Sequence, residues 1–295
     1  MNKVLISGGS GLLGTRISEM LIEQGVEVAH LSTRTGYRRE GVKVYYWNPD
    51  EAYIDEQAFD RVDAVIHLAG AGIADKRWTD KRKKEIIDSR VNSSRLLIDF
   101  LKQSAHQVKV FAGASAIGYY GESAGVLGEE VAPGNDFMAH VCAVWEQSYT
   151  QLPEAIRKVV FRIGIVLSQD GGALPEMTKT LPFFVGVLGD GQQVYSWIHI
   201  DDLAKMFVEG ITRKEFEGVY NAVAPYPVKQ LTLAKAIAKH KNTFTLPAPK
   251  FGLQLAFGEM SAVLFLSQEC SAKKVEDAGF TFAYPTIDEA VEDLM

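Results

Sequence analysis

A glycine-rich segment near the start of the chain has the residue types and spacing of a phosphate-binding loop. It follows the apolar run Lys3–Ser7 and reads Gly8-Gly9-Ser10-Gly11-Leu12-Leu13-Gly14. Gly8 permits a tight turn, Gly11 lets the backbone approach a pyrophosphate, and Gly14 lets the next helix pack closely on the strand. Free amides at the start of that helix would then face the negative charge. The spacing predicts a dinucleotide site, although a plain tight turn between strand and helix is the alternative.

The end of the second predicted strand indicates which nicotinamide cofactor fits. An acidic residue there would hydrogen-bond the adenosine ribose and repel a 2′-phosphate, whereas arginine favours that phosphate. After Leu31 the chain continues as Ser32-Thr33-Arg34, followed by Arg38 and Arg39 with no acidic residue among them. We therefore expect NADP(H), with Thr33 and Arg34 at the adenosine ribose and its phosphate. The alternative is that Arg34 only stacks on the adenine of either cofactor.

Composition and charge exclude several other kinds of chemistry. The chain has 295 residues and a net charge of -6, which supplies no basic field for nucleic acid or for an anionic membrane. Its two cysteines, Cys142 and Cys270, lack the spacing of a metal site or a disulfide framework. No signal peptide precedes the first strand, and no apolar run approaches the roughly 20 residues that span a bilayer. We expect a cytoplasmic protein with a small-molecule substrate, no metal and an oligomeric state that the sequence does not specify.

Alternating strand and helix patterns must position these residues. Strands are expected at Lys3–Ser7, Glu27–Leu31, Lys43–Trp47, Asp63–Leu68, Lys109–Ala112 and Lys158–Arg162. Helices are expected at Leu12–Gln24, ending at Gly25, and at Thr79–Gln103, where the basic run at 81–84 would be a solvated face. This alternation predicts an α/β protein with a Rossmann-type, doubly wound parallel sheet.

The composition of the sequence changes after about residue 170, where glycine and proline become frequent. Helical stretches are expected there at Asp201–Thr212, Thr232–His240, Phe251–Gly258 and Ser267–Ala278. We expect Asp201 or Asp202 to be the N-cap of the first of these helices. The pattern indicates a Rossmann domain over residues 1–170 and a smaller mixed lobe over 171–295, with some strands and helices returning to the main domain.

Further segments make the sequence resemble a known family along its whole length, the extended short-chain dehydrogenase/reductases and their epimerase/dehydratase relatives. The matching segments are the GxxGxxG loop, His67-Leu68-Ala69-Gly70, Ser115 with Tyr120-Gly121, and Trp197–Asp202. A narrower set resembles one atypical branch of NAD-dependent epimerase-like proteins with a small uncharacterised C-terminal domain, here about 247–295. These segments are Ala74–Thr79, Ser89-Arg90, Ala116–Gly121, Phe257–Met260 and Asp277–Phe280.

The resemblance implies further contacts with the cofactor. Residues after the fourth strand would lie along the adenosine ribose and lead toward the nicotinamide, and residues after the sixth strand would back the nicotinamide. Two polar residues on the long helix match positions near the cofactor, although an intrahelical or surface ion pair would account for them equally well. The implied positions are Leu68, Ala69, Gly70, Glu85, Arg90, Ile163 and Gly164.

The catalytic pair of the wider family is missing. There a tyrosine and a lysine four residues later move the proton that accompanies hydride transfer, and the lysine lowers the pKa of the tyrosine. Aligned on Trp145-Glu146, these positions are Met138 and Cys142, which cannot do this work. Ser115 matches the residue that holds the substrate oxygen, and Tyr120 offers a phenol on the same loop. We predict Ser115 and Tyr120 as catalytic, the alternative being that both only line the cofactor pocket.

Two functions follow from this combination. The first is an NADP(H)-binding, epimerase/dehydratase-like oxidoreductase that acts on a small polar substrate with a non-standard acid/base group. The alternative is a non-catalytic NADP(H)-binding regulator or redox sensor. A pure scaffold is disfavoured, because nothing in a scaffold requires a phosphate cradle lined with glycine.

Overall fold

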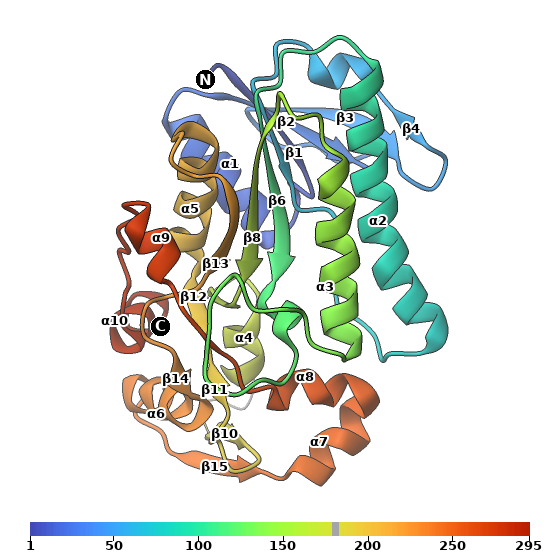
Figure 1. Cartoon of the computed structure of the whole chain (residues 1–295). Coiled ribbons are helices and arrows are strands. Elements are labelled where there is room, and N and C mark those ends of the chain that lie inside the picture. The colour runs from blue at the N-terminus through green and yellow to red at the C-terminus, as the bar shows by residue number, and fades with distance from the viewer. Residues whose placement is uncertain (179–182) are drawn as a thin grey trace.

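A large sheet forms the centre of the computed structural model, which describes residues 1–178 and 183–295 (Figure 1). Its strands follow the order β13-β8-β6-β5-β1-β2-β3-β4, and only β3 and β4 pair antiparallel. Their bounds are Lys3–Ser7 for β1, Glu27–Ser32 for β2, Val42–Asn48 for β3, Tyr53–Ile54 for β4, Ala64–His67 for β5, Val110–Ala116 for β6, Arg157–Ile163 for β8 and Gly218–Ala222 for β13. The strand order reverses direction at β1, so the predicted Rossmann-type, doubly wound sheet is confirmed.

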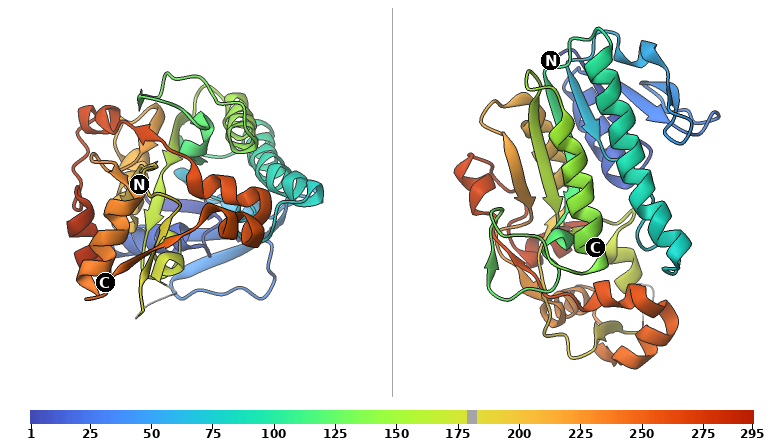
Figure 2. Two further views of the ribbon diagram at one scale, coloured as in Figure 1. Left: turned by 90° about the horizontal axis from the view of Figure 1, so that it is seen from below. Right: turned by 45° about the vertical axis from the view of Figure 1, so that its right-hand side comes forward.

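Helices cover both faces of this sheet. The helices α1 (Leu12–Glu23) and α5 (Ile200–Thr212) pack together on one face, and α2 (Asp80–Gln103) and α3 (Phe137–Ser148) pack together on the other (Figures 1 and 2). The strands β1 and β5 are consequently buried along their whole length, as parallel strands between two helix layers are. None of the helices in the described ranges is both long and apolar enough to cross a membrane.

The register of the central strands brings several predicted loops to one edge. Ser7 on β1 lies opposite Leu31 on β2 and His67 on β5. The segments that follow, beginning with Gly8, Ser32 and Leu68, therefore leave the sheet side by side. This is the carboxyl edge at which the strand order reverses, where open α/β sheets bind their ligands.

The elements after β8 gather mainly at this carboxyl edge, in the lower part of Figure 1. Around Trp197, Leu233 and Ile237 they form a second hydrophobic core, while β13 and α5 join the main sheet layers. The strands are β9 (Ile165–Leu167), β10 (Val185–Leu188), β11 (Val194–Tyr195), β12 (Trp197–His199), β14 (Val228–Lys229) and β15 (Thr245–Ala248). The helices are α4 (Ala173–Thr178), α6 (Gln230–His240), α7 (Lys250–Phe257), α8 (Ala262–Phe265) and α10 (Ile287–Leu294).

The predicted helix over Ser267–Ala278 is wrong. The strand β16 (Glu269–Cys270) pairs there with β7 (Val126–Leu127), and only the short helix α9 (Lys273–Asp277) follows. Just before β16, the side chain of Gln268 is buried and donates to the carbonyls of Ile117 and Gly121, at 2.9 and 2.8 Å. These contacts with a distant part of the chain favour extended backbone over a longer helix.

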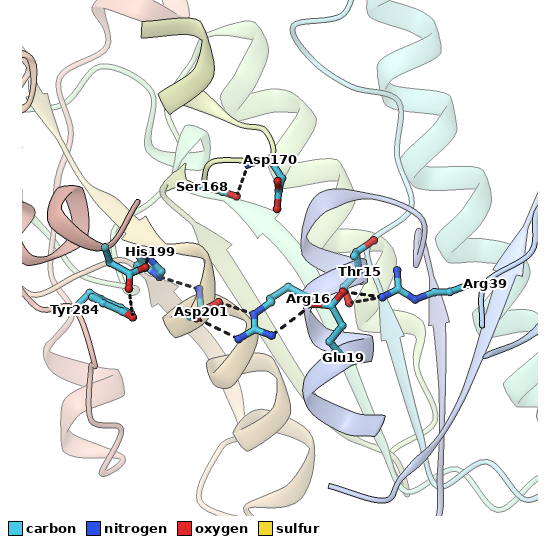
Figure 3. A network of polar contacts seen from close by, with 10 residues as sticks. Thr15, Arg16, Glu19, Arg39, Ser168, Asp170, His199, Asp201 and Tyr284 are labelled. Atoms are coloured by element: carbon cyan, nitrogen blue, oxygen red, sulfur yellow. Dashed lines mark hydrogen bonds and ion pairs between the residues drawn. The ribbon is translucent and has the colours of Figure 1, made fainter. Parts of the chain in front are cut away.

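The predicted cap of α5 is also wrong. Neither Asp201 nor Asp202 caps the helix; His199 does, by accepting the Asp201 amide at Nδ1, 3.1 Å away. The Asp201 carboxylate instead binds Arg16 on α1, 2.6 Å from Nε, as Figure 3 shows. Asp202 is buried and accepts both backbone amides of Ala283–Tyr284. Both carboxylates therefore hold neighbouring segments and are unavailable as caps.

Candidate dinucleotide-binding site

The segment after β1 is a tight turn with little room for side chains. Gly8 has a φ of +74°, and a Cβ there would lie 2.9 Å from the carbonyl carbon of Leu68. A Cβ on Gly14 would lie 2.5 Å from the Gly8 oxygen. At Gly11 the same oxygen is the one near atom, at 3.3 Å, among the described residues. Gly11 also precedes α1 without a side-chain cap, so the first amides of the helix can meet an anion.

A buried histidine packs against the glycine loop at Gly9. The His30 ring lies 2.4 Å from the position of a Cβ on Gly9, and it hydrogen-bonds Ser18 Oγ (2.8 Å) and Tyr37 Oη (3.2 Å). Because the Ser18 hydroxyl donates to Gly14, the ring donates through Nε2 and accepts from Tyr37 through Nδ1. Burial, helped by the charge of Arg39, lowers the pKa of His30 to about 4. The ring is therefore neutral at pH 7.

A cavity of about 700 Å³ lies along the loop, between the ends of β1, β2, β3 and β5 and one face of α2. Its size falls in the range of small-molecule and cofactor sites. Seven of the predicted cofactor residues line it: Gly8, Ser10, Thr33, Arg34, Ala69, Gly70 and Glu85. The carboxylate of Glu85 also pairs with Arg82 at 2.7 Å, so the intrahelical ion pair considered for Glu85 is present as well.

The arginine predicted to recognise a 2′-phosphate stands at the edge of this cavity. Arg34 Nη2 donates to Ser10 Oγ in the glycine loop, at 3.0 Å. No carboxylate among the described residues pairs with Arg34. The site thus combines a cradle of backbone amides with an exposed cation at the end of β2.

Some of the residues that line the cavity were not predicted from the sequence. Tyr46–Asp50, which begins on β3 and continues beyond its end, forms one wall. Lys81, Lys84 and Asp88 on α2 also line the cavity, although the basic run was expected to be a solvated face. Two signals were available, because β3 ends at the same edge as its neighbours and positions 81, 84 and 88 share one face of a helix.

Other predicted cofactor residues lie outside this cavity. Leu13 and Leu68 pack on the hydrophobic core, and Leu12 lies 3.4 Å from the position of a Cβ on Gly171. Ile163 ends β8, and Gly164 allows a close approach of strands, since its Cβ would lie 2.6 Å from the oxygen of Ser196. Arg90 is buried beside Gly70.

Ser115 belongs to a buried network of charged groups. Its Oγ donates to Glu146 Oε1 at 2.7 Å. Arg162 holds both oxygens of Glu146 through hydrogen bonds of 2.8 and 2.9 Å, and the side chains of Arg162 and Glu146 are only 4% and 13% exposed. Sequence reasoning missed Glu146 and Arg162 as functional residues. The available signal was the charged side chain of Arg162, which directly follows the apolar run Val159–Phe161 in the buried part of β8.

Tyr120 is built into the same network and points away from solvent. The residue is 2% exposed; its hydroxyl donates to Asn221 Oδ1 at 2.7 Å and accepts from Arg162 Nη1 at 2.9 Å. Burial raises the pKa of Tyr120 well above its usual value, against the opposing effect of Arg162. The phenol proton is thus already committed to a protein acceptor.

The two residues of α3 that align with the family's tyrosine and lysine cannot replace them. Met138 and Cys142 on α3 are both buried. Burial raises the pKa of the Cys142 thiol to about 12, so the thiol stays protonated at neutral pH. His140 on the same helix is exposed. Proton transfer near Ser115 would therefore have to use another group.

Comparison with known proteins agrees with this geometry. The model of the NAD-dependent epimerase/dehydratase family matches residues 4–223, and a domain of unknown function, DUF1731, matches 248–294. An epimerase family protein of Staphylococcus saprophyticus is 34% identical, with 100% of each chain covered. The chloroplastic epimerase family protein SDR39U1 homolog of Arabidopsis thaliana is 32% identical, over 99% of this chain and 86% of that protein.

Solved structures share the fold of this chain. The human epimerase family protein SDR39U1, solved with NADPH, superposes with a TM-score of 0.87 at 27% identity and covers 99% of this chain and 98% of that one. The UDP-glucuronic acid 4-epimerase of Bacillus cereus, solved with NAD, shares the fold at a TM-score of 0.76 and 15% identity, over 98% and 96% of the two chains. With a family model matched over most of its length, this chain belongs to the NAD-dependent epimerase/dehydratase family.

Proposed function

We propose that the chain is an NADP(H)-dependent oxidoreductase that acts on a small polar substrate. The observation that carries the proposal is the glycine cradle, open at Gly11, with the unpaired cation of Arg34 beside it. The human relative solved with NADPH supports the same cofactor. When bound, the nicotinamide would accept or deliver a hydride, while the protein residues would orient the substrate and move the accompanying proton.

Arg34 would select the phosphorylated cofactor. Its guanidinium is anchored to Ser10 and faces no carboxylate among the described residues, so a 2′-phosphate would meet an available charge-assisted donor. An unphosphorylated ribose would leave that charge without a partner. The preference expected from one such contact is about tenfold, or about 1.4 kcal/mol.

Titration with NADPH and NADH, read by energy transfer from tryptophan, tests the cofactor. We expect NADPH to bind at least about tenfold more tightly, and Arg34→Ala to remove most of the difference. Arg38→Ala is the matched control, because Arg38 donates to the nearby carbonyls of Thr35 and Tyr37 and does not line the cavity. Equal affinities of the wild-type protein for the two cofactors would contradict the assignment of Arg34.

We further propose that Ser115 and Glu146, which are joined by a hydrogen bond, move the proton in place of the missing tyrosine and lysine. In the oxidative direction Ser115 Oγ would take the proton of a substrate hydroxyl while passing its own proton to Glu146 Oε1. Arg162 would hold the Glu146 carboxylate in place for this transfer. Reduction would run through the same atoms in reverse.

Glu146→Gln and Tyr120→Phe distinguish this route from the phenol predicted from the sequence. An activity is first sought with aldehydes, ketones and nucleotide sugars, followed by NADPH absorbance. Glu146→Gln should lower kcat by about a hundredfold, the usual effect of a lost acid/base group, and leave NADPH binding unchanged. Tyr120→Phe should keep kcat within a few fold. The reverse pattern would restore Tyr120 as the proton donor.

The alternative function is a non-catalytic NADP(H)-binding regulator. Two observations favour it. The Tyr120 hydroxyl already bonds Asn221 and Arg162. The side chains of Met138 and Cys142 are buried and cannot move the proton. A wild-type protein that binds NADPH well and turns over no member of a broad carbonyl panel would favour this alternative.

A further inference from the structure

Basic and acidic residues are distributed unevenly along the chain. Residues 218–258 contain five lysines and no aspartate or glutamate, whereas the whole chain has 31 basic and 37 acidic residues. Without these five lysines the rest of the chain holds 26 basic and 37 acidic residues, a net charge of -11. The expectation that the chain lacks a basic field rests on its net charge, which averages two unlike parts. The five are Lys229, Lys235, Lys239, Lys241 and Lys250.

The charge of these lysines is available to a partner. All five are exposed. No carboxylate side chain among the described residues forms an ion pair with any of them, unlike Lys205 and Lys273 nearby in the sequence. A ligand with negative charges would therefore meet cations that no acidic side chain neutralises.

The same segment also exposes large apolar side chains. Among the described residues eleven large apolar side chains are exposed, and six of them belong to residues 218–258. Phe251 and Leu255 are 76% and 70% exposed and lie four positions apart, so they share one face of α7. The other four are Tyr226, Phe244, Leu246 and Phe257. Apolar surface concentrated in this way marks a contact with a protein or a membrane.

The helix α7 is the clearest part of this surface. Seven of its eight residues are exposed and none is buried, although five of them are apolar. A helix that is apolar on most sides is normally buried. Arg77 nevertheless fixes the end of this helix, donating to the carbonyls of Leu255 and Ala256 at 2.6 Å each. The helix is thus held in place while its apolar side chains meet solvent.

The position of these elements favours one kind of partner. The helix α6, the strand β15 and the helix α7 follow one another in the chain and form the lower end of the molecule in Figure 1. A second copy docked there would bring lysines against lysines. An anionic lipid surface satisfies both features, because lysines bind its headgroups while phenylalanine and leucine enter the boundary with the acyl chains. A lipid surface also accepts a protruding helix without a matching shape.

We propose that the end of the molecule formed by α6, β15 and α7 binds the surface of anionic membranes. Phe251 and Leu255 would enter the headgroup boundary, and the five lysines would contact the lipid phosphates. The contact would lie on the membrane and not across it. The acidic remainder of the chain would face away from the membrane, because like charges repel. This binding is independent of the proposed NADP(H) site.

Flotation of the full chain with lipid vesicles tests the proposal. We expect it to bind vesicles of equal parts phosphatidylglycerol and phosphatidylcholine. Binding to phosphatidylcholine alone should be at least about tenfold weaker, since each lysine near an anionic surface contributes about fivefold. Raising the salt from about 0.1 M to about 1 M should weaken binding to the anionic vesicles by screening. Hydrogen exchange over residues 244–257 should slow when these vesicles are added.

Two double variants separate the apolar contribution from the charged one. Phe251→Ser combined with Leu255→Ser removes the most exposed apolar side chains of α7. Lys235→Glu combined with Lys239→Glu reverses two charges on α6. Each double variant should weaken binding to the anionic vesicles by about tenfold or more.

Tyr53→Ser and Lys214→Glu are the matched controls, because they change an exposed aromatic residue and an exposed lysine outside residues 218–258 and should bind like the wild type. Thermal melting shows whether each variant is folded, and Phe251→Gln alone carries the comparison should the double serine variant not fold. Wild-type protein that binds no vesicles or binds both kinds equally would overturn the proposal, and so would binding that survives both double variants. A dimer that Phe251→Ser disrupts, with no vesicle binding, would assign this surface to a second copy instead.

Discussion

Gly11 and Gly14 lie three residues apart in the cradle, yet a side chain at each position would meet different surroundings. At Gly14 a Cβ would lie 2.5 and 2.6 Å from backbone atoms of Gly8 and Gly9, which cannot move aside without opening the turn. At Gly11 the backbone is extended (φ -82°, ψ 172°), a conformation open to any residue, and among the described residues only the Gly8 oxygen, at 3.3 Å, lies within reach of a Cβ there. Gly14 is therefore required for the packing of the turn, whereas Gly11 leaves room for the ligand.

Valine at each position should therefore separate folding from binding. Gly11→Val should keep the free energy of unfolding within about 1 kcal/mol and abolish detectable binding of both NADPH and NADH. Gly14→Val should lower the free energy of unfolding by about 2 kcal/mol or more, because backbone overlap in a packed turn costs at least as much as overpacking a core. Urea denaturation and cofactor titration of the two variants provide the measurements. Cofactor binding by folded Gly11→Val would show that the loop is only a turn.

The sequence predicted individual residues well where a local rule applied, and less well where tertiary contacts decide. Thr33 and Arg34 line the cavity because they follow a strand in a parallel sheet, which sequence patterning can locate. The bond between Ser115 and Glu146 joins residues 31 positions apart, and no local pattern reports such pairing. Tyr120 was selected for its chemistry, but its burial depends on Asn221, which lies on β13, a strand the sequence did not indicate.

At the scale of elements, α5 is held to its neighbours by two adjacent carboxylates in different environments. Asp201 pairs with Arg16 on α1, and the two side chains are 31% and 30% exposed, so water screens the pair. Asp202 is buried and accepts the amides of Ala283 and Tyr284, at 2.7 and 2.9 Å, which anchors the segment leading to α10. Tyr284 in turn stacks on His199, with ring centroids 3.9 Å apart (Figure 3).

Replacing each aspartate with asparagine should reveal this difference. Asp202→Asn leaves one oxygen for two amide donors and should lower the free energy of unfolding by about 1 to 3 kcal/mol. Asp201→Asn should lower it by less than about 1 kcal/mol, the usual range of an exposed ion pair. Urea denaturation measures both variants, and limited proteolysis shows whether α10 is released in Asp202→Asn. Equal losses in the two variants would contradict the anchoring role of Asp202.

Element prediction succeeded where hydrophobic periodicity is strong and failed where pairing is long-range. The first six predicted strands differ from the observed ones by a few residues at their ends, because buried apolar runs between helices are easily recognised. The two-residue strand β16 has no such run and exists because it pairs with β7, more than 140 positions earlier in the chain. Similarly, His199 caps α5 because both neighbouring aspartates bind elsewhere in the fold.

At the scale of the whole molecule, the C-terminal segment contributes directly to the architecture of the site. Gln268 holds the loop between Ile117 and Gly121, which carries Tyr120. Arg77, which lies in the segment Ala74–Thr79 that resembles the atypical branch, donates to the carbonyl of Ala256 at the end of α7. Lys83 on α2 pairs with Glu259 just beyond that helix, at 2.6 Å. Truncating the tail would therefore disturb the nucleotide-binding half too.

Three buried histidines, His67, His30 and His199, make the stability of the whole molecule sensitive to acid, because burial lowers the pKa of each. His67 on β5 bonds Ser7 Oγ on β1 at 2.6 Å and Ser94 Oγ on α2 at 3.1 Å, so it links two strands with a helix. Burial, helped by the charge of Arg90, lowers its pKa to about 3, and burial likewise lowers that of His30 to about 4. Both folded-state values lie below 6.5, the ordinary value, so below that pH the unfolded chain binds more protons than the folded one.

The sign of the pH dependence follows from this difference. The stabilising contribution of each neutral histidine is fully present above about pH 6.5 and is lost as the pH falls toward the folded-state pKa, by up to about 1.4 kcal/mol per pH unit for each residue. Urea denaturation between about pH 7.5 and about pH 5, where the usual carboxylate pKa values contribute little, should show this decline. NADPH affinity should fall over the same range if protonation of His30 disturbs the loop at Gly9.

His67→Gln and His140→Gln identify the source of the decline. Glutamine at 67 can still bond Ser7 and Ser94 but does not titrate, so this variant should lose part of the slope of stability against pH and keep the part due to His30 and His199. His140 is exposed, and its replacement should leave the slope unchanged. A wild-type protein whose free energy of unfolding stays flat from about pH 7.5 to about pH 5 would show that water reaches the buried histidine rings, since hydration would return their pKa values to the ordinary range.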